Sequence, residues 1–387
     1  MNLVNAPLVN KHSGNRMVIG FFAVRIILFL SLPLEGIQSY GDLNHFHGWA
    51  QLAGWPFLEY WMEFPPLFPL LAEILFRLAG GREHTFHYAL ALLFTLAQTA
   101  NLALFLRIAY ILNPSQADRR GWMYFTALVG LFYGWTYLDP LAVLALLAGA
   151  YLLLREDRIR SALLFGLGAL VKWFPLLGLA ALAKKDGSLA WRPLLAGAAV
   201  VAAGWGTLLL ASPDYTLASL RSQSAKGSWE TIWALLDGNL TTGNFGAKEE
   251  RYDPATALQP LGHPPVISPL LTLIPFAALG AWATLRADLT TPRGRLALIA
   301  LALCLFCIWS PGWSPQWVLY FLPFILLLLP ERRAVLITLL FVLISLLEWP
   351  LLLSRGMFWG LYLTVPLRTL LIALLGYDCW RMLDWKN

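Results

Sequence analysis

The chain alternates between long apolar segments and short polar ones over almost its whole length. Apolar runs close to the roughly 20 residues that cross a bilayer recur from residue 17 to residue 379. The pattern predicts helical segments at 17–34, 67–79, 86–112, 121–138, 140–154, 161–183, 193–211, 264–286, 296–310, 316–330, 334–353 and 358–378. It therefore predicts an all-α polytopic membrane protein, with about 11–13 transmembrane helices in one membrane domain, 1–387.

Two polar segments, 35–66 and 212–262, are longer than the rest. Short loops between apolar segments are typically cytoplasmic when they carry Lys and Arg. The short loops here carry many such residues, among them Arg119, Arg120, Arg155, Arg158, Lys184, Lys185, Arg192, Arg293, Arg295, Arg332 and Arg333. We therefore expect 35–66 and 212–262 to be a first and a second external loop.

This topology places two conditions on the helices. Segment 67–79 must not cross the membrane fully, which its length of about 13 residues favours. Segment 161–183 must consist of two half-helices, with the break near Lys172 and Pro175.

Composition supports a membrane protein and excludes other classes. The chain is 58% hydrophobic and 13% charged, against about 25% charged residues in soluble domains. The net charge of +6 resides mainly in loops between helices, so we do not expect nucleic-acid binding. Cys304 and Cys307 lie in an apolar run, where cysteine usually packs as a small hydrophobe.

The first external loop contains the stretch YGDLNHFHGWAQLAGWPFLEYWMEFPP, residues 40–66, with the acids Asp42, Glu59 and Glu63. A carboxylate at a membrane surface can act as a general base on an acceptor hydroxyl. Glu59 and Glu63 are four residues apart, which is one turn if that part is helical. The alternative for each acid is a solvated loop position without a chemical role.

Lys172 and Asp139 are further candidates. A lysine within an apolar run is costly and marks a functional site by default, although its side chain can also extend to the interface. Asp139 precedes Pro140 at the turn of a helical hairpin, where a capping role is the alternative.

The first loop resembles that of GT-C-fold membrane glycosyltransferases of glycosyltransferase family 87. Tyr40-Gly41-Asp42 is followed by a Trp-Ala pair and then by GWPFLEYWMEFPPL. The family has an early aspartate and then a G-x-P-Y-x-D-x-x-x-E-Y-P-P pattern. Asp42 matches the early aspartate, Glu59 stands at the D position, and Glu63-Phe64-Pro65-Pro66 matches E-Y-P-P. Glu at 59 and Phe at 57 and 64 depart from the pattern.

Later stretches resemble the same family, in the same order, over roughly residues 17–330. SALLFGLGALVKWFPL, 161–176, is similar to a small-residue helix that ends in a lysine and a proline. SLRSQSAKGSWETIW is similar to an R-G-x-x-x-E-S-type stretch and contributes Arg221, Lys226 and Glu230. SPQWVLY resembles S-P-Q-Y-x-x-W and contributes Ser314 and Gln316.

The resemblance implies a GT-C-like bundle and an inverting, mannosyltransferase-like hexosyltransferase. Its donor would be a polyprenyl-phosphate sugar, and its acceptor an envelope glycan, lipid or protein on the outer face, as in a bacterial cytoplasmic membrane. Asp42 would be catalytic, and Glu59 and Glu63 would position the acceptor or a metal. The donor phosphate would contact Lys172, Arg221 and Lys226, with Asp139, Glu230, Ser314 and Gln316 as further site residues. No cofactor is required, although these carboxylates suit Mg²⁺ or Mn²⁺.

Two other functions remain open. A transporter or flippase of lipid-linked glycans would also use an intramembrane lysine, but transporters commonly show repeats between halves, which this sequence lacks. A polysaccharide polymerase or ligase would typically carry its large, arginine-rich outer loop late in the chain. Here the earliest outer loop is the distinctive one.

Overall fold

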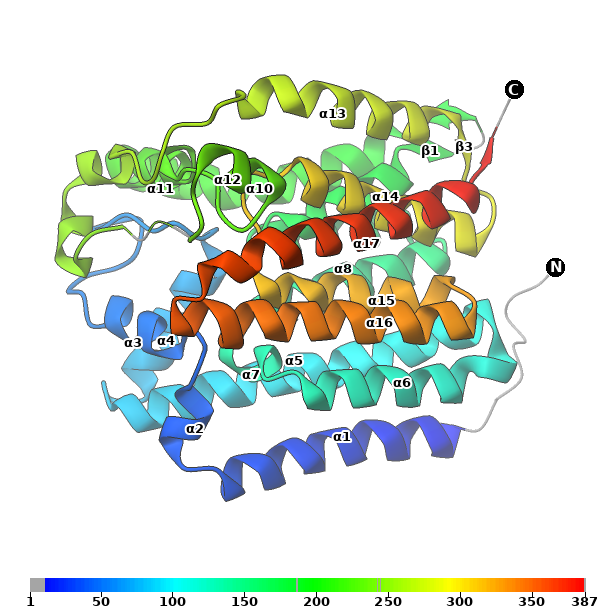
Figure 1. Ribbon diagram of the computed structural model, residues 1–387, viewed down its shortest axis with the longest axis horizontal. Helices are drawn as coiled ribbons and strands as arrows, with labels where there is room; N and C mark the ends of the chain where they lie inside the picture. The colour runs from blue at the N-terminus through cyan, green and yellow to red at the C-terminus, as the bar shows by residue number, and fades with distance from the viewer. Residues whose placement is uncertain (1–10, 186, 242, 244, 386–387) are drawn as a thin grey trace.

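The computed structural model describes residues 11–185, 187–241, 243 and 245–385 and shows a bundle of α-helices (Figure 1). The helices are α1 (Lys11–Ser31), α2 (Leu34–Gln38), α3 (Leu43–Ala50), α4 (Leu67–Leu78), α5 (Glu83–Leu112), η2 (Pro114–Gln116), α6 (Ala117–Gly130), α7 (Tyr133–Thr136), α8 (Asp139–Leu154), α9 (Arg158–Ala169), η3 (Phe174–Leu182), α10 (Trp191–Ala211), α11 (Pro213–Ala225), α12 (Ile232–Asp237), η4 (Lys248–Tyr252), η5 (Pro254–Leu258), α13 (Pro269–Arg286), α14 (Pro292–Trp309), η6 (Pro315–Trp317), α15 (Val318–Leu328), α16 (Glu331–Leu346), η7 (Leu347–Leu352), η8 (Leu353–Arg355), η9 (Phe358–Gly360) and α17 (Leu361–Arg381). Two short antiparallel ribbons join β1 (Lys184–Lys185) to β2 (Ser188–Leu189) and β3 (Ala287–Asp288) to β4 (Asp384–Trp385).

The bundle is that of a multi-pass membrane protein. Within the described residues, 7 helical stretches are long and apolar enough to cross a bilayer. They are Ser13–Ser31, Glu83–Leu112, Trp191–Ala211, Pro269–Arg286, Pro292–Trp309, Glu331–Arg355 and Phe358–Arg381, with shorter apolar helices at Asp139–Leu154 and Pro315–Leu328. The predicted all-α polytopic class is confirmed.

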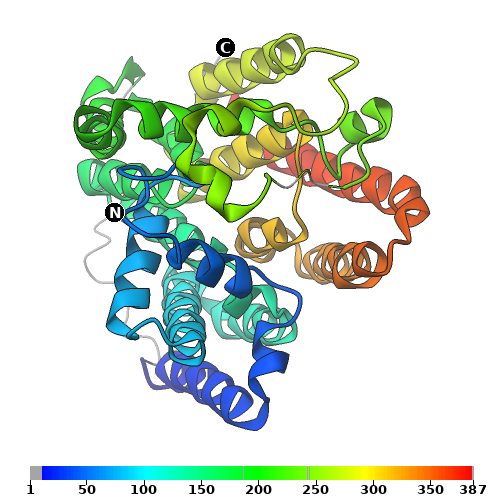
Figure 2. The same ribbon diagram turned by 90° about the vertical axis from the view of Figure 1, so that its left-hand side faces the viewer.

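The two ends of the bundle differ in character. Both ends of the described chain lie at one end, together with the β1–β2 and β3–β4 ribbons (Figure 1). The long polar segments 35–66 and 212–262 cover the opposite end, which faces the viewer in Figure 2. We refer to this opposite end as the loop end.

Segment 161–183 forms two half-helices, as expected. α9 and η3 pack antiparallel, because Gly168 lies against Pro175 and Gly178 lies against the ring of Phe165. The Arg158 guanidinium closes the base of this hairpin by donating to the carbonyls of Leu182 and Lys184. The tip of the hairpin, residues 170–173, therefore lies at the loop end and carries Lys172.

The core lies along α5, α8, α14 and α15. Every residue of α15 is buried, as expected for a helix that is apolar on all sides and surrounded by other helices. By contrast, α10 and α13 expose most of their side chains and cover the outside of the bundle. Cys304, Cys307 and Cys379 are buried free thiols within this packing.

Candidate functional site

A cavity of about 880 Å³ opens at the loop end, between the two long polar segments and the ends of the central helices. Its wall contains all the candidate residues named from the sequence except Glu59 and Arg221. The residues brought together are Asp42, Glu63, Asp139, Lys172, Lys226, Glu230, Ser314 and Gln316. Five separate parts of the chain thus supply one polar site.

Asp42 stands at the N-cap position of α3, but its side chain makes no capping hydrogen bond and lines the cavity instead. The backbone around it is held from several sides. The Asp42 amide donates to the carbonyl of Thr136 at 3.1 Å. The carbonyl of Tyr40 accepts from the Tyr137 hydroxyl at 2.9 Å and from the Trp349 indole at 2.7 Å. These bonds fix the backbone at Asp42, while its side chain lines the cavity.

Gly41 permits the close contact beneath Asp42. A Cβ atom at this position would lie 2.1 Å from the Cβ of Thr136, a separation that atoms do not adopt. The preceding Tyr40 has φ of 60°, a left-handed conformation that is uncommon for residues other than glycine. Its carbonyl contacts hold it in that conformation.

The surroundings of Asp42 bring the pKa of its carboxyl close to neutral pH. Burial raises the pKa of Asp42 from 3.8 to about 7, with Lys172 and Lys226 opposing the shift and Asp139 and Glu63 adding to it. A general base works best when its pKa lies near the operating pH. Asp42 therefore has the position and the acidity that a base needs.

Lys172 faces this site from the tip of the α9–η3 hairpin. Its ammonium nitrogen lies 2.7 Å from Oδ1 of Asp139 and 5.6 Å from the centre of the Trp317 ring. Asp139 is 1% exposed, so the ion pair is largely shielded from solvent. An ammonium group has three donors, and Asp139 engages one of them.

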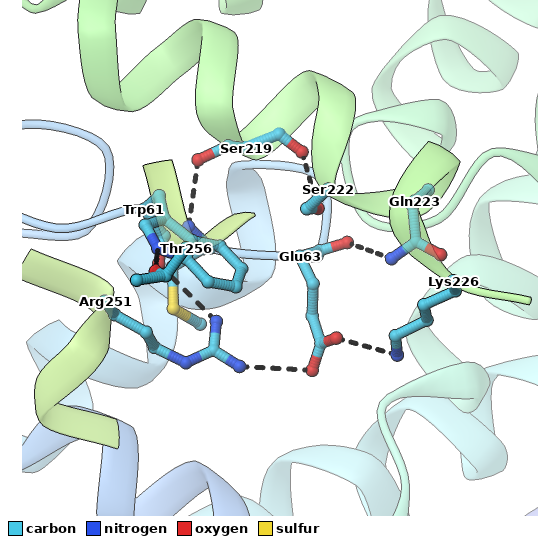
Figure 3. Close-up of polar contacts among 9 residues, drawn as sticks. Trp61, Glu63, Ser219, Ser222, Gln223, Lys226, Arg251 and Thr256 are labelled. Carbon is cyan, nitrogen blue, oxygen red and sulfur yellow. Dashed lines mark hydrogen bonds and ion pairs between the residues drawn. The ribbon is translucent and has the colours of Figure 1, made fainter. Parts of the chain in front are cut away.

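Glu63 connects the two long polar segments, 35–66 and 212–262 (Figure 3). Its carboxylate contacts Lys226 at 2.8 Å and Arg251 at 3.4 Å, and its carbonyl accepts from Gln223 at 2.9 Å. Figure 3 shows the two cations approaching the carboxylate from opposite sides. The guanidinium of Arg251 also lies 4.4 Å from the centre of the Trp61 ring.

The neighbouring residues extend this junction. The amide of Met62 donates to Ser219 at 2.9 Å, and the Trp61 indole donates to Thr256 at 3.0 Å. Burial opposes ionisation of Glu63, but Lys226 and Arg251 outweigh it, and the pKa of Glu63 lies below its ordinary value. Glu63 is therefore ionised, and its salt bridges to Lys226 and Arg251 join the two polar segments.

The opposite wall comes from residues 226–231 and 310–317. The two strands of backbone lie side by side, with the Trp229 amide donating to the carbonyl of Pro311 at 3.0 Å and the Trp313 amide donating to that of Trp229 at 3.0 Å. This pairing brings Glu230 and Ser314 into one wall. Burial raises the pKa of Glu230 to about 8, with Glu348 adding to the shift and Arg368 opposing it, so this acid is largely protonated at pH 7.

Behind Glu230 lies a buried ion pair that the sequence analysis missed. Arg368 of α17 pairs with Glu348 of η7 and donates to the carbonyl of Glu230. It also lies 4.6 Å from the centre of the Trp313 ring. The available signal was a charge inside each of two apolar segments, which by itself marks a functional or structural site.

Glu59 and Arg221 lie outside the cavity wall. Glu59 is exposed, and its carboxylate accepts from the amide of Trp55 at 2.5 Å. Residues 51–66 contain no helix, so Glu59 and Glu63 do not share a helical turn. Arg221 is exposed on α11. The structure therefore does not bring these two residues together with the other candidates, in contrast to the single site expected from the sequence.

The carboxylates of the first loop do not form a metal site. Glu59 is elsewhere, and both oxygens of Glu63 contact cations. Among the residues that the structure describes, the one cluster of three metal-ligating side chains is His47, Glu83 and His87, none of which is an acid of the loop. Asp42, Glu59 and Glu63 therefore do not fit a shared Mg²⁺ or Mn²⁺ ion.

A second, apolar groove of about 350 Å³ adjoins the cavity. It lies between η3, α13 and α14, and its wall shares Phe306 and Trp309 with the cavity. Leucine, alanine and phenylalanine side chains supply most of the remaining lining, including Leu176, Leu273, Phe276 and Leu301. The polar site thus has an apolar groove at its side.

Comparison of the chain with protein-family models, with curated proteins and with solved structures finds no match.

Proposed function

We propose that this protein is a membrane glycosyltransferase with a GT-C-like fold that transfers a hexose from a polyprenyl-phosphate donor to an acceptor hydroxyl. The observation that carries the proposal is the position of Asp42, which faces Lys172 and Lys226 across one cavity. A base opposite two cations suits a reaction in which a hydroxyl loses a proton and a phosphate leaves.

Asp42 accepts the proton of the acceptor hydroxyl as the oxygen attacks the anomeric carbon of the sugar. The bond between that carbon and the phosphate oxygen breaks, and the lipid phosphate leaves with the electron pair. Attack and departure on opposite sides invert the anomeric configuration. Lys172 and Lys226 stabilise the negative charge on the departing phosphate, an electrostatic contribution that is often the largest in such sites.

The apolar groove supports a lipid-linked donor. A polyprenyl chain needs an apolar surface that begins where its phosphate is bound, and the groove shares Phe306 and Trp309 with the polar cavity. The phosphate would lie near Lys172 while the chain follows η3, α13 and α14. The hexose, which the family resemblance suggests is mannose, would occupy the polar cavity beside Ser314 and Gln316.

The reaction would take place on the outer face of the membrane, with an envelope glycan, lipid or protein as acceptor. Basic residues concentrate in the short loops at the end opposite the cavity, and such loops are retained in the cytoplasm. The cavity would then open outside, as in a bacterial cytoplasmic membrane.

The test is an assay of the purified protein with a labelled polyprenyl-phosphate hexose and a mixture of envelope acceptors. A glycosyltransferase releases free polyprenyl phosphate and labels the acceptor. A flippase, assayed in vesicles, moves the labelled lipid without breaking it, and a polymerase or ligase requires a lipid-diphosphate donor. Flipping without release of lipid phosphate would contradict the proposal.

A further inference from the structure

A second cluster of polar side chains lies where α3 meets the N-terminal end of α5, separate from the wall of the cavity. His47 of α3 and Glu83 and His87 of α5 place one ligand atom each within 4.8 Å of one another. Oε1 of Glu83 lies 3.9 Å from Nδ1 of His87, and the two imidazole rings are 5.4 Å apart, centre to centre. The proposed reaction uses none of these three residues.

His47 has an unused coordinating atom. His47 is 9% exposed, and its Nε2 atom has no hydrogen-bond partner among the described residues. Phe76 and Phe86 pack around the ring, so no solvent layer replaces the missing partner.

His87 is oriented by a backbone contact. Its Nε2 lies 3.1 Å from the carbonyl of Leu43, to which it donates, so Nδ1 carries the lone pair and accepts from the side-chain amide of Gln38 at 2.5 Å. Histidines that bind metals usually donate their second ring N–H to a backbone carbonyl or a carboxylate, which fixes the tautomer. His87 satisfies that condition through Leu43, and its Nδ1 becomes available to a metal once the Gln38 amide turns its nitrogen away.

Gln38 completes the surroundings. Its side-chain amide lies 2.5 Å from Nδ1 of His87 and 3.1 Å from Oε1 of Glu83. The oxygen and nitrogen of such an amide are assigned from their neighbours, and a rotation of the amide would place its oxygen beside the same two residues. The cluster can therefore offer a metal ion a fourth ligand atom, the side-chain oxygen of Gln38.

We propose that His47, Glu83 and His87 bind a divalent transition-metal ion, with Zn²⁺ as the ion that best fits two imidazoles and one carboxylate. Zn²⁺ takes such ligands at about 2.0–2.2 Å in a tetrahedral arrangement, whereas Mg²⁺ and Ca²⁺ prefer oxygen ligands. Tetrahedral bonds of this length require ligand atoms about 3.4 Å apart, so the site needs a small inward rotation of the Glu83 side chain, which is half-exposed.

The ion would hold α3 against the N-terminal end of α5. Leu43, whose carbonyl accepts from His87, directly follows Asp42. A metal that fixes His87 thereby fixes the first residue of α3 after the proposed base. The ion is a positioning element and does not contact the cavity.

Metal content of the full-length protein in detergent tests the proposal. The protein is stripped with a chelator, exposed to Zn²⁺, passed through a desalting column and analysed for zinc per chain. We expect about one zinc for each chain in the unaltered protein and in His84→Ala, which removes an exposed histidine on α5 next to Glu83. We expect no retained zinc in His47→Ala and His87→Ala.

Two further measurements keep the result independent of folding and of the transferase proposal. Glu83→Gln changes a half-exposed side chain without removing bulk, so this variant should fold. It should bind Zn²⁺ at least tenfold more weakly, because changing a residue that only supports a metal ligand already weakens binding by about 10- to 100-fold. Zn²⁺ should raise the Tm of the stripped protein but not that of His47→Ala. No zinc above background in the unaltered protein, or equal zinc in all variants, would overturn the proposal whether or not sugar transfer occurs.

Discussion

The ammonium group of Lys172 lies 2.7 Å from the carboxylate of Asp139, at the tip of the α9–η3 hairpin. The two residues are 33 positions apart and reach the cavity from different helices. Because Asp139 engages one of three donors on the ammonium group, the remaining donors can contact a phosphate in the cavity. The ion pair thus holds in place a largely buried cation that would be costly without a partner.

Separating this ion pair should destabilise the protein. Asp139→Ala leaves the Lys172 charge without its partner, and removing one member of a buried pair typically costs about 3–5 kcal/mol. Reversible unfolding in mixed micelles measures the loss. Glu156→Gln is the matched control, because Glu156 pairs with Arg295 at 2.5 Å but is 58% exposed, so its loss should lie below about 1 kcal/mol. Equal losses in the two variants would contradict the account.

Lys226 and Arg221 are cations of the same helix region, but only Lys226 lines the cavity. We therefore expect Lys226→Ala to raise the KM for the lipid-phosphate donor and to lower kcat, because it removes charge that acts on the departing phosphate. Arg221→Ala should leave both constants within about twofold of the unaltered protein, since surface changes of this kind usually have small effects. Steady-state kinetics with labelled donor distinguish the two. A larger defect in Arg221→Ala would assign the phosphate to the outer surface of α11.

The activity should depend on the ionisation of Asp42. Burial raises the pKa of this carboxyl to about 7, and a base acts only when ionised. Below pH 7, kcat/KM should fall about tenfold for each pH unit, and above pH 7 it should reach a plateau. A profile that rises as the pH falls would show that Asp42 does not act as the base.

The stability of the protein should also depend on the ionisation of Asp42, but it should decrease as the pH rises, whereas the activity should increase. The pKa of Asp42 is 3.8 in its ordinary state and about 7 in the fold, so between these values the folded protein binds more protons than the unfolded chain. Stability attributable to Asp42 therefore decreases as the pH rises through this range. Asp42→Asn should flatten that decrease, which Tm values from pH 5 to pH 8 would reveal. An unchanged slope would indicate that Asp42 is not buried as described.

Gly41 offers a test of the loop that holds Asp42. Gly41→Ala would place a Cβ atom 2.1 Å from Thr136, so the loop must shift and activity should fall by about 100-fold, as expected for a 1 Å misplacement of a reacting group. Gly48→Ala is the control in the same region, because its added atom would meet only the flexible side chain of Lys248 at 4.0 Å. It should retain activity, with a small gain in helix stability. Equal activity in both variants would contradict the close packing at Gly41.

The apolar periodicity was sufficient to predict most helices, including the break in 161–183. Lys172 and Pro175 interrupt an apolar run, and a charge and a proline are features that are costly within a spanning helix. The short length of α4 was equally informative. These features are local in sequence, which is why they could be recognised without the structure.

The arrangement of the first loop was harder to predict. Between Glu59 and Glu63 the amides of Trp61 and Met62 donate to Arg251 and Ser219 and not to a helical turn. The spacing of the two acids alone does not reveal these distant partners. Likewise, Lys226 and Arg221 have similar chemistry, and only the docking of α11 on the first loop shows which one faces the cavity. The pairing of Arg368 with Glu348 depends on how η7 and α17 meet, which no local pattern specifies.

The most direct test of the central claim is release of polyprenyl phosphate from labelled donor by Asp42→Asn, compared with Glu59→Gln. Both variants neutralise one acid of the same loop, but only Asp42 lines the cavity. The account predicts that Asp42→Asn inserts into the membrane normally and loses transfer by at least 100-fold, the lower end of the contribution of a general base, while Glu59→Gln remains active. Full activity in Asp42→Asn would contradict it.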